Sequence, residues 1–218
     1  MAFLELDKVC FTYPGQAEPA LTEISLVFEQ EEITALIGHN GSGKTTLTKL
    51  IIGVLKPQEG KIILSGRIIK EYSLAEVGRR IGYVFQNPDL QLFCASVEQE
   101  IGFGPEKSGR SQEEVKEIVD FYLEYFELAN YRNTFPLHLS QGEKQRLAIA
   151  AMLANEPEFL ILDEPTVGLD AYRKKNLEDY LKKVAALGRG MIIVSHDTDF
   201  VHRMTQRKIV LAKGKLLE

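Results

Sequence analysis

The sequence predicts an α/β fold with a mainly parallel central sheet, an N-terminal antiparallel β subdomain and an inserted α-helical subdomain. Three observations support this prediction. Four short apolar runs lack the alternation of a half-exposed strand, the first thirty residues show that alternation, and residues 88–155 have helical periodicity. The chain of 218 residues has room for one full domain. We therefore expect a single domain over 1–218, with the helical subdomain inserted at about 88–155.

The strands are justified by their hydrophobic patterns. Near the N-terminus, Ile24, Leu26 and Phe28 alternate with polar neighbours, and the turn-forming run 13–15 separates this strand from an earlier one. The four apolar runs are expected to be strands buried on both faces of a parallel sheet. They cover residues 33–37, 81–85, 159–162 and 191–194.

The helices and the C-terminal strands follow from local signals. Ser111 and Glu114 form a capping-box pair at the start of a helix in the inserted segment. A last helix is expected over residues 170–187. The chain then closes with a strand at 208–212, a turn at 213–214 and a short return strand.

The composition excludes several classes of protein. Twenty-six basic and 31 acidic residues give a net charge of −5, which argues against a broad basic face, so we expect no nucleic-acid partner. Cys10 and Cys94 are too few for a disulfide framework or a zinc site, which favours a cytosolic chain. No apolar run approaches the roughly 18–20 residues of a membrane helix, and the N-terminus does not read as a secretory signal.

Residues 38–45 match the phosphate-loop pattern G-x-x-x-x-G-K-[ST] at every fixed position. The loop follows an apolar strand and opens a helix over about 44–53, so its backbone amides and the positive helix end can surround a β-phosphate. Lys44 would reach the β- and γ-phosphates, and the Thr45 hydroxyl can bind Mg²⁺. This places the fold in the P-loop NTPase class. The predicted loop residues that bind the nucleotide are Gly38, His39, Asn40, Gly41, Ser42, Gly43, Lys44, Thr45 and Thr46.

Polar residues follow each of the other three buried strands. These are Gln86 after the second run, Asp163 and Glu164 after the third, and His196 after the fourth. Each could alone be an ordinary loop or turn residue. If the strands are parallel, however, all four gather at one sheet edge beside the phosphate loop, and we favour this joint interpretation.

The expected chemistry is hydrolysis of ATP to ADP and phosphate by positioning and electrostatics, without a covalent intermediate. Asp163 would hold Mg²⁺ with Thr45 and Gln86, and Glu164 would act as general base for the attacking water. His196 would contact the γ-phosphate, so Glu164, His196 and Gln86 are the predicted catalytic residues.

Residues 139–146, Leu-Ser-Gln-Gly-Glu-Lys-Gln-Arg, resemble the signature motif of the ABC (ATP-binding cassette) ATPases. Tyr13 stands in the A-loop position, Gln86 in the Q-loop, residues 168–170 in the D-loop, and His196 at the switch histidine. The resemblance covers essentially the whole chain. We call residues 139–146 the signature segment.

The resemblance implies a composite site. Two ABC ATPase subunits, as a homodimer or a heterodimer, would sandwich two ATP molecules, with Ser140 and Gly142 of one chain facing the nucleotide of the other. Ser140 can also be an ordinary N-cap, and both roles are compatible. Tyr13 would stack on the adenine. The segment departs from the usual L-S-G-G-Q at Gln141 and Glu143, so we expect weaker or more asymmetric closure.

The Q-loop run 84–93 is similar to ATPase subunits of energy-coupling-factor and cobalt/nickel-type importers, which take up vitamins or transition metal ions. This similarity implies a cytoplasmic subunit on the inner face of the cell membrane. A transmembrane coupling subunit would dock in a groove near Leu90, Leu92, Phe93 and Val97. The alternative is that these four residues are core residues of the helical insertion.

Two other functions stay open on the sequence. One is a non-transport ABC-class ATPase with a role in DNA repair, chromosome structure or translation. The other is a regulator in which ATP drives dimerisation with little turnover.

Overall fold

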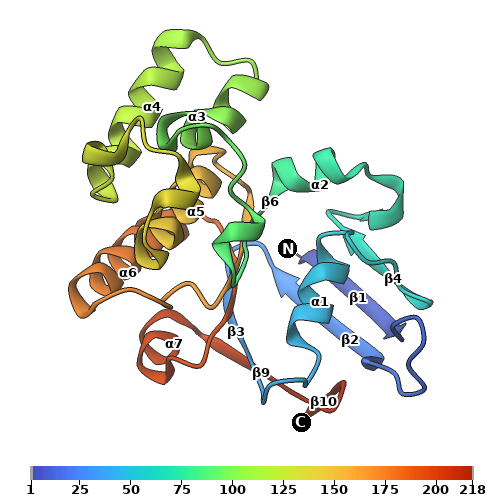
Figure 1. Ribbon diagram of the computed structural model, residues 1–218. Helices are drawn as coiled ribbons and strands as arrows, with labels where there is room; N and C mark the ends of the chain where they lie inside the picture. The colour runs from blue at the N-terminus through green and yellow to red at the C-terminus, as the bar shows by residue number, and fades with distance from the viewer. Residues whose placement is uncertain (1, 218) are drawn as a thin grey trace.

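The computed structural model describes residues 2–217, and within this range the chain forms two sheets (Figure 1). The first sheet is antiparallel and has the strand order β2-β1-β4-β5. In β2, Ile24, Leu26 and Phe28 are buried and alternate with exposed neighbours, as the sequence predicts. The strands are β1 (Ala2–Phe11), β2 (Leu21–Glu29), β4 (Glu59–Leu64) and β5 (Arg67–Ile68).

The second sheet has the order β10-β9-β3-β8-β7-β6. β9, β3, β8, β7 and β6 run parallel, and β10 returns antiparallel beside β9. The four predicted buried strands are therefore adjacent, and their carboxyl ends share one edge. The strands are β3 (Ile33–Ile37), β6 (Ile81–Val84), β7 (Phe159–Asp163), β8 (Met191–Val194), β9 (Arg207–Ala212) and β10 (Lys215–Leu217).

Helices cover both faces of this sheet, and α3, α4 and α5 gather at the end away from β1 and β2 (Figure 1). The capping box predicted at Ser111 and Glu114 starts α4. Helix α2, helix α7 and strands β4 and β5 are additions that the sequence analysis did not predict. The helices are α1 (Lys44–Ile51), α2 (Leu74–Arg80), α3 (Val97–Lys107), α4 (Gln112–Tyr125), α5 (Gln141–Ala154), α6 (Ala171–Ala186) and α7 (Thr198–Met204).

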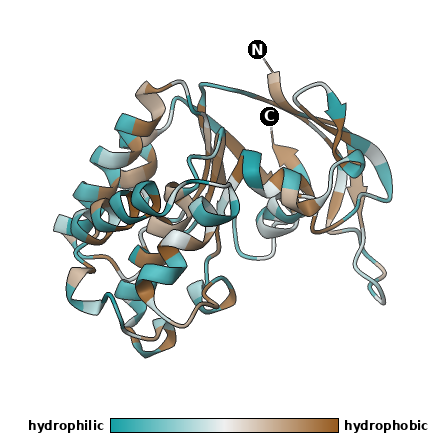
Figure 2. Cartoon of the chain, turned by 90° about the horizontal axis from the view of Figure 1, so that it is seen from above, coloured by the Kyte–Doolittle hydropathy of each residue, from teal (hydrophilic) through white to brown (hydrophobic). Residues whose placement is uncertain are grey.

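The parallel sheet separates two hydrophobic clusters. In β7, Leu160 and Leu162 belong to the cluster shared with α3 to α6, whereas Phe159 and Ile161 belong to the cluster shared with α1 and the antiparallel sheet. Successive side chains of a strand point to opposite faces, so both faces of β7 are buried, which explains its unbroken apolar run. Figure 2 shows these strands as hydrophobic ribbons between helices with hydrophilic outer turns.

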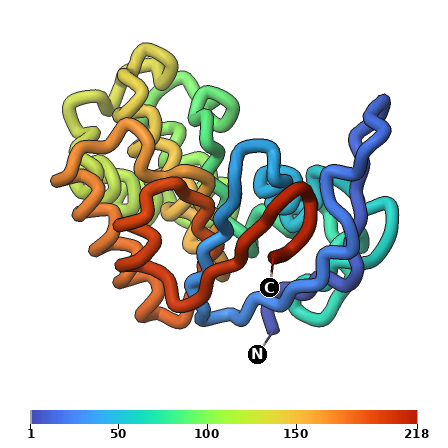
Figure 3. The backbone as a smooth tube through the Cα atoms, turned by 90° about the horizontal axis from the view of Figure 1, so that it is seen from below, coloured from blue at the N-terminus to red at the C-terminus, as the bar shows by residue number. Residues whose placement is uncertain are grey.

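The C-terminal hairpin β9–β10 packs against the N-terminal half of the chain. The Gly214 amide donates to the Ser42 carbonyl at 3.0 Å, and the Thr22 amide donates to the Gly214 carbonyl at 2.9 Å. In Figure 3 the red hairpin accordingly lies beside the blue N-terminal segments. None of the helices within residues 2–217 combines the length and the apolar character needed to cross a membrane.

Candidate active site

The phosphate loop joins β3 to α1 at the carboxyl edge of the parallel sheet. Gly43 has φ 106°, and a Cβ added there would lie 2.8 Å from the Ala20 carbonyl oxygen. A Cβ on Gly38 would lie 2.2 Å from the Leu211 carbonyl oxygen, whereas nothing lies within 4 Å of the corresponding position on Gly41. Gly38 and Gly43 are therefore required by packing against β2 and β9, and Gly41 leaves open the face that a phosphate would approach.

Lys44 lies along this loop. Its side chain is buried, and its ammonium group donates to the carbonyl oxygens of Gly38 at 2.7 Å and His39 at 3.0 Å. Helix α1 has no side-chain cap at its N-terminus, so its first amides have no side-chain acceptor. Uncapped amides beside a lysine ammonium form an anion-binding site of the kind that a phosphate occupies.

A cleft of about 780 Å³ opens over the loop. It brings together the polar residues predicted at the ends of β6, β7 and β8 with most of the loop residues. Gly38, His39 and Ser42 belong to the loop but do not line the cleft. The predicted residues that line it are Tyr13, Asn40, Gly41, Gly43, Lys44, Thr45, Thr46, Gln86, Asp163, Glu164 and His196.

Glu164 is held in a strained conformation at the end of β7. Its φ is 52°, which is uncommon for a residue with a side chain, and it is only 7% exposed. Its carboxylate accepts hydrogen bonds from the Ser195 hydroxyl at 3.3 Å and the His196 amide at 3.2 Å. Two residues that directly follow β8 thus fix the direction of a carboxylate that can accept a proton from a water molecule in the cleft.

His196 connects the end of β8 with the phosphate loop. Its Nε2 lies 3.2 Å from Oδ1 of Asn40 and 3.5 Å from Oε1 of Glu164. The imidazole is exposed to the cleft, so a group bound on the loop can contact it.

Asp163 stands beside Glu164 but on the inner side of the cleft. Burial raises the pKa of its carboxyl group, and the Tyr83 hydroxyl donates to it at 3.3 Å. Tyr83 is itself hydrogen-bonded to Thr48 of α1, so the sheet edge and the phosphate-loop helix are joined behind the carboxylate.

Thr45, Gln86 and Asp163 together supply hydroxyl, amide and carboxylate oxygens to this cleft. Within residues 2–217 no group of three His, Cys, Asp or Glu side chains gathers for a metal. A site with few protein carboxylates suits Mg²⁺, which keeps several waters and binds substrate phosphates. The residues present therefore fit magnesium held jointly with a nucleotide.

Tyr13 also lines the cleft. Its ring packs edge-on against Phe11, with ring centroids 5.0 Å apart, and its hydroxyl lies 3.1 Å from the Thr46 hydroxyl. The ring is therefore fixed next to the phosphate loop, where a base attached to a bound triphosphate can stack on it.

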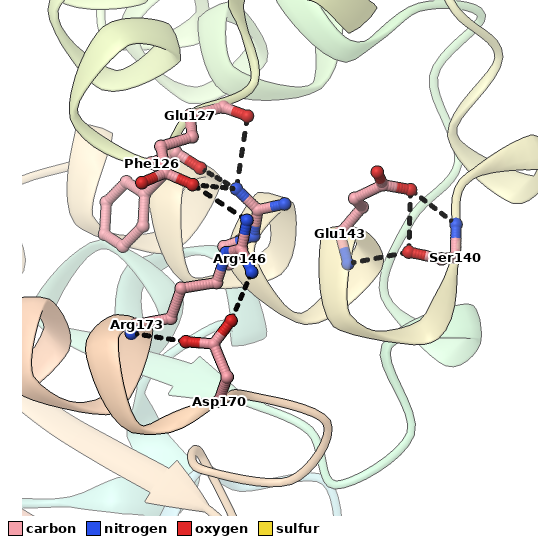
Figure 4. Close-up of polar contacts among 7 residues, drawn as sticks. All are labelled: Phe126, Glu127, Ser140, Glu143, Arg146, Asp170 and Arg173. Carbon is pink, nitrogen blue, oxygen red and sulfur yellow. Dashed lines mark hydrogen bonds and ion pairs between the residues drawn. The ribbon is translucent and has the colours of Figure 1, made fainter.

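The structure does not bring Ser140 and Gly142 into the cleft. Ser140 is the N-cap of α5, and Figure 4 shows its side chain facing Glu143. The Glu143 carboxylate accepts from the Ser140 amide at 2.8 Å and from its hydroxyl at 2.7 Å. Hydrogen bonds from Tyr131 and Ser140 lower the pKa of Glu143, so it stays ionised at neutral pH.

Gln141 and Gly142 of the signature segment are each explained by the local geometry of this chain. Gln141 has an ordinary helical conformation as the first residue of α5, so its side chain does not restrict the backbone there. Gly142 allows a close approach within the chain itself, because a Cβ at this position would lie 2.6 Å from the Gly168 carbonyl oxygen. Gly142 therefore packs the signature segment against residues 168–170.

The four residues expected to line a groove after β6 differ in their exposure. Leu90 is 75% exposed and Phe93 is 65% exposed, so both are accessible. Leu92 and Val97, in contrast, are core residues of the helical insertion, with 5% and 0% exposure. The alternative interpretation holds for these two residues, because Leu92 packs into the hydrophobic cluster shared with α3 to α6 and Val97 is the first residue of α3.

The cleft also has walls that the sequence analysis missed. They come from the loop between β1 and β2, from the end of β8 and from the β9–β10 turn. No motif marks these residues, although the turn at 213–214 was itself predicted. The additional lining residues are Gln16, Glu18, Pro19, Ala20, Val194, Lys213 and Gly214.

The sequence of the chain is similar to known ABC transporter proteins. A family model described as ABC transporter matches residues 21–167. An energy-coupling factor transporter ATP-binding protein, EcfA, of Methanothermobacter thermautotrophicus is 40% identical over 217 residues, covering 98% of this chain and 69% of the relative. An ABC transporter ATP-binding protein of Methanosarcina acetivorans is 41% identical over 211 residues, 97% of this chain. The chain spans 34% of the length of that second relative.

Solved structures share the fold over nearly the whole chain. The structure of cbiO1 from Clostridium perfringens, described as part of the ABC transporter complex cbiONQ, has a TM-score of 0.84 and 34% identity, covering 100% of this chain and 87% of that one. The ATP-binding cassette MJ0796, solved as a dimer in a post-hydrolysis state with ADP and phosphate, has a TM-score of 0.89 and 28% identity. The match covers 99% of this chain and 97% of the MJ0796 chain.

Proposed function

The chain belongs to the ABC transporter family of ATPases, and from this membership we propose that it energises a membrane importer for a vitamin or a transition metal ion. The observation that carries the nucleotide part is the convergence of Gln86, Asp163, Glu164 and His196 on the cleft above the phosphate loop. The importer class is supported by the similarity to an energy-coupling factor ATP-binding protein and to cbiO1.

In the proposed reaction Lys44 leaves the loop carbonyls and binds the β- and γ-phosphates, while the open amides of α1 bind the phosphate oxygens. Thr45, Gln86 and Asp163 would hold magnesium, which would neutralise charge on the phosphates. Glu164 accepts the proton of the attacking water, and its hydrogen bonds from Ser195 and His196 keep the carboxylate aimed into the cleft.

We propose that a second ABC ATPase subunit completes the site. Ser140 lies outside this chain's own cleft, at a helix N-terminus on the surface, so it is available to a nucleotide held by another subunit. The dimer formed by MJ0796 supports this arrangement. Whether the second subunit is another copy or a related chain does not change the role of Ser140.

For the membrane partner we propose docking beside α3. Phe93 and Phe103 are both exposed, and their rings meet edge-on with centroids 4.9 Å apart. They line a groove of about 230 Å³ that also contains Gln91 and Met152, and Leu90 is exposed in the neighbouring turn. An apolar helix of a transmembrane coupling subunit fits such a groove and would hold this chain peripherally on the inner face of the membrane.

Co-purification from membranes tests this function. The tagged chain should bring down a second ABC ATPase subunit and a multi-spanning membrane protein, and the complex should hydrolyse ATP. Phe93→Asp should release the membrane protein without changing ATP affinity. Leu187→Asp is the matched control, because Leu187 is 71% exposed at the C-cap of α6, outside the groove. Retention of the membrane protein by Phe93→Asp would contradict the docking surface, and a complex without a membrane protein would contradict the importer.

A further inference from the structure

One cationic residue of the cleft lies outside the phosphate loop and the strand ends. Within residues 2–217, Lys44 and Lys213 are the lysines that line the cleft, and no arginine lines it. Lys213 occupies the turn between β9 and β10, at the C-terminal end of the chain. It is therefore far from Lys44 in the sequence but faces the same cleft.

Hydrogen bonds anchor this turn to the phosphate loop. The Gly214 amide donates to the Ser42 carbonyl, and the Gly214 carbonyl accepts from the Thr22 amide. A Cβ on Gly214 would lie 2.6 Å from the Ala20 carbonyl oxygen, so the turn is packed closely against the start of β2. The backbone of Lys213 is consequently fixed relative to the loop. In Figure 3 the red hairpin lies beside the blue segments of the N-terminal half.

The conformation of Lys213 is unfavourable for a lysine. Ala212 pairs with Lys215, so the hairpin has a two-residue turn, and φ is 47° at Lys213 and 74° at Gly214. Positive φ at both central residues defines a type I′ turn, in which the first position favours Asn, Asp or Gly. Of the non-glycine residues within 2–217 that have positive φ, only Glu164 and Lys213 line the cleft. Strain of this kind is concentrated at functional positions.

The charge of the cleft calls for a second cation. Glu18, Asp163 and Glu164 contribute carboxylates to its lining, and a bound nucleotide adds more negative charge. Lys213 is exposed and forms no hydrogen bond or ion pair with any residue of the described chain. Its ammonium group is thus free to bind an anionic ligand.

We infer that Lys213 is a nucleotide-binding residue whose ammonium group binds the phosphates of a nucleoside di- or triphosphate from the C-terminal hairpin. This inference rests on the proposed ATP-binding function of the cleft. The β9–β10 turn would then supply a second cation to the nucleotide site, in addition to Lys44 of the phosphate loop.

The test is Lys213→Asn, with ATP and ADP affinity measured by titration calorimetry. Asparagine suits a type I′ turn, so the variant should fold and melt at the same or a higher temperature than the unmodified protein. Loss of one exposed charge should weaken the binding of ATP and of ADP about two- to fivefold at low salt. The difference in affinity between the variant and the unmodified protein should shrink at about 0.5 M salt, because salt screens the charge. Lys213→Arg should retain the affinity.

Lys215→Asn is the matched control, since Lys215 is an exposed lysine on the same hairpin that does not line the cleft. Equal affinity of Lys213→Asn and the unmodified protein, or an equal loss in Lys215→Asn, would overturn the inference. Lys44→Ala separates this failure from failure of the proposed function. If Lys44→Ala loses ATP while Lys213→Asn does not, only the role of Lys213 is wrong; if Lys44→Ala also binds normally, the nucleotide site itself is wrong.

Discussion

The N-termini of α1 and α5 are chemically opposite, although each lies in a glycine-containing motif that the sequence assigns to phosphate binding. Helix α1 begins after Gly43 without a side-chain cap, and a lysine lies beside its free amides. Helix α5 begins with a complete capping box, in which Glu143 accepts from both the amide and the hydroxyl of Ser140. The first terminus is open to an anion, whereas a carboxylate already occupies the second.

This difference suggests a division of roles. The α1 side gathers lysine, metal-binding oxygens and the candidate base in one chain, so it can bind a nucleotide alone. The α5 side offers the Ser140 hydroxyl, which donates to Glu143 and lies outside the cleft of its own chain. It therefore contributes to nucleotide binding only when another subunit presents its nucleotide. Variants on the α1 side should therefore have large effects in the single chain, and variants on the α5 side should have small effects that require the pair.

The largest effect is expected at Glu164. Glu164→Gln removes the proton acceptor but keeps the size of the side chain, so ATP turnover of the purified complex should fall about 10²- to 10⁴-fold while ATP affinity changes little. Phosphate release and equilibrium binding measure the two quantities. Glu23→Gln is the control, because Glu23 also has positive φ but lies on β2, outside the cleft. Undiminished turnover would assign the base to another residue.

Lys44→Ala should give the next largest effect, on binding. Charge-assisted hydrogen bonds to the phosphates would be lost, which costs about 3 kcal/mol, or roughly a hundredfold in ATP affinity. Lys49→Ala, in the last turn of the same helix, should bind ATP normally. If Lys44→Ala bound ATP with unchanged affinity, the contrast between the two helix N-termini would be wrong, because the N-terminus of α1 would then bind anions no better than that of α5.

Tyr13→Ala should weaken ATP binding by about 1–3 kcal/mol through loss of base stacking. Tyr13→Phe keeps the ring and loses only the contact with Thr46, so its effect should be at most about 1 kcal/mol. Ribose triphosphate, which lacks a base, should bind both variants and the unmodified protein equally. A loss of ribose triphosphate binding in Tyr13→Ala would show that the residue supports the loop and does not contact adenine.

The smallest effect is expected on the α5 side. Glu143→Gln keeps an oxygen that can accept from Ser140 but removes the negative charge, so ATP-dependent subunit association should tighten about two- to fivefold. Glu114→Gln makes the same change in the matching capping box of α4, away from the site, and should leave association unchanged. Weaker association in Glu143→Gln would show that the carboxylate helps to bind the partner.

The parts of the fold that sequence predicted best are those with a single dominant signal. Residues 33–37 and 191–194 match β3 and β8 residue for residue, because buried parallel strands leave unbroken apolar runs. Helix α2 was missed although Ser73 and Glu76 form a capping box, because Val77 is its one buried residue and no apolar stripe marks the helix.

The candidate site likewise contains residues that the sequence predicts and residues that it does not. The phosphate loop and the strand-end residues are visible in sequence because each is tied to a local motif. Lys213 and Glu18 reach the cleft only through the packing of β2, β9 and β10, which brings distant segments together. Leu92 and Phe93 show most clearly what the sequence could not predict. These two apolar residues are adjacent in an irregular segment, but Leu92 is buried in the core and Phe93 is exposed.

The most direct test of the account is a structure of the Glu164→Gln complex with magnesium and a nonhydrolysable ATP analogue. We predict that Lys44 has moved from the loop carbonyls to the phosphates, and that the γ-phosphate lies between His196 of one subunit and Ser140 of the other. A triphosphate bound away from the ends of β6, β7 and β8, or flanked by no second α5 helix, would contradict the central claim.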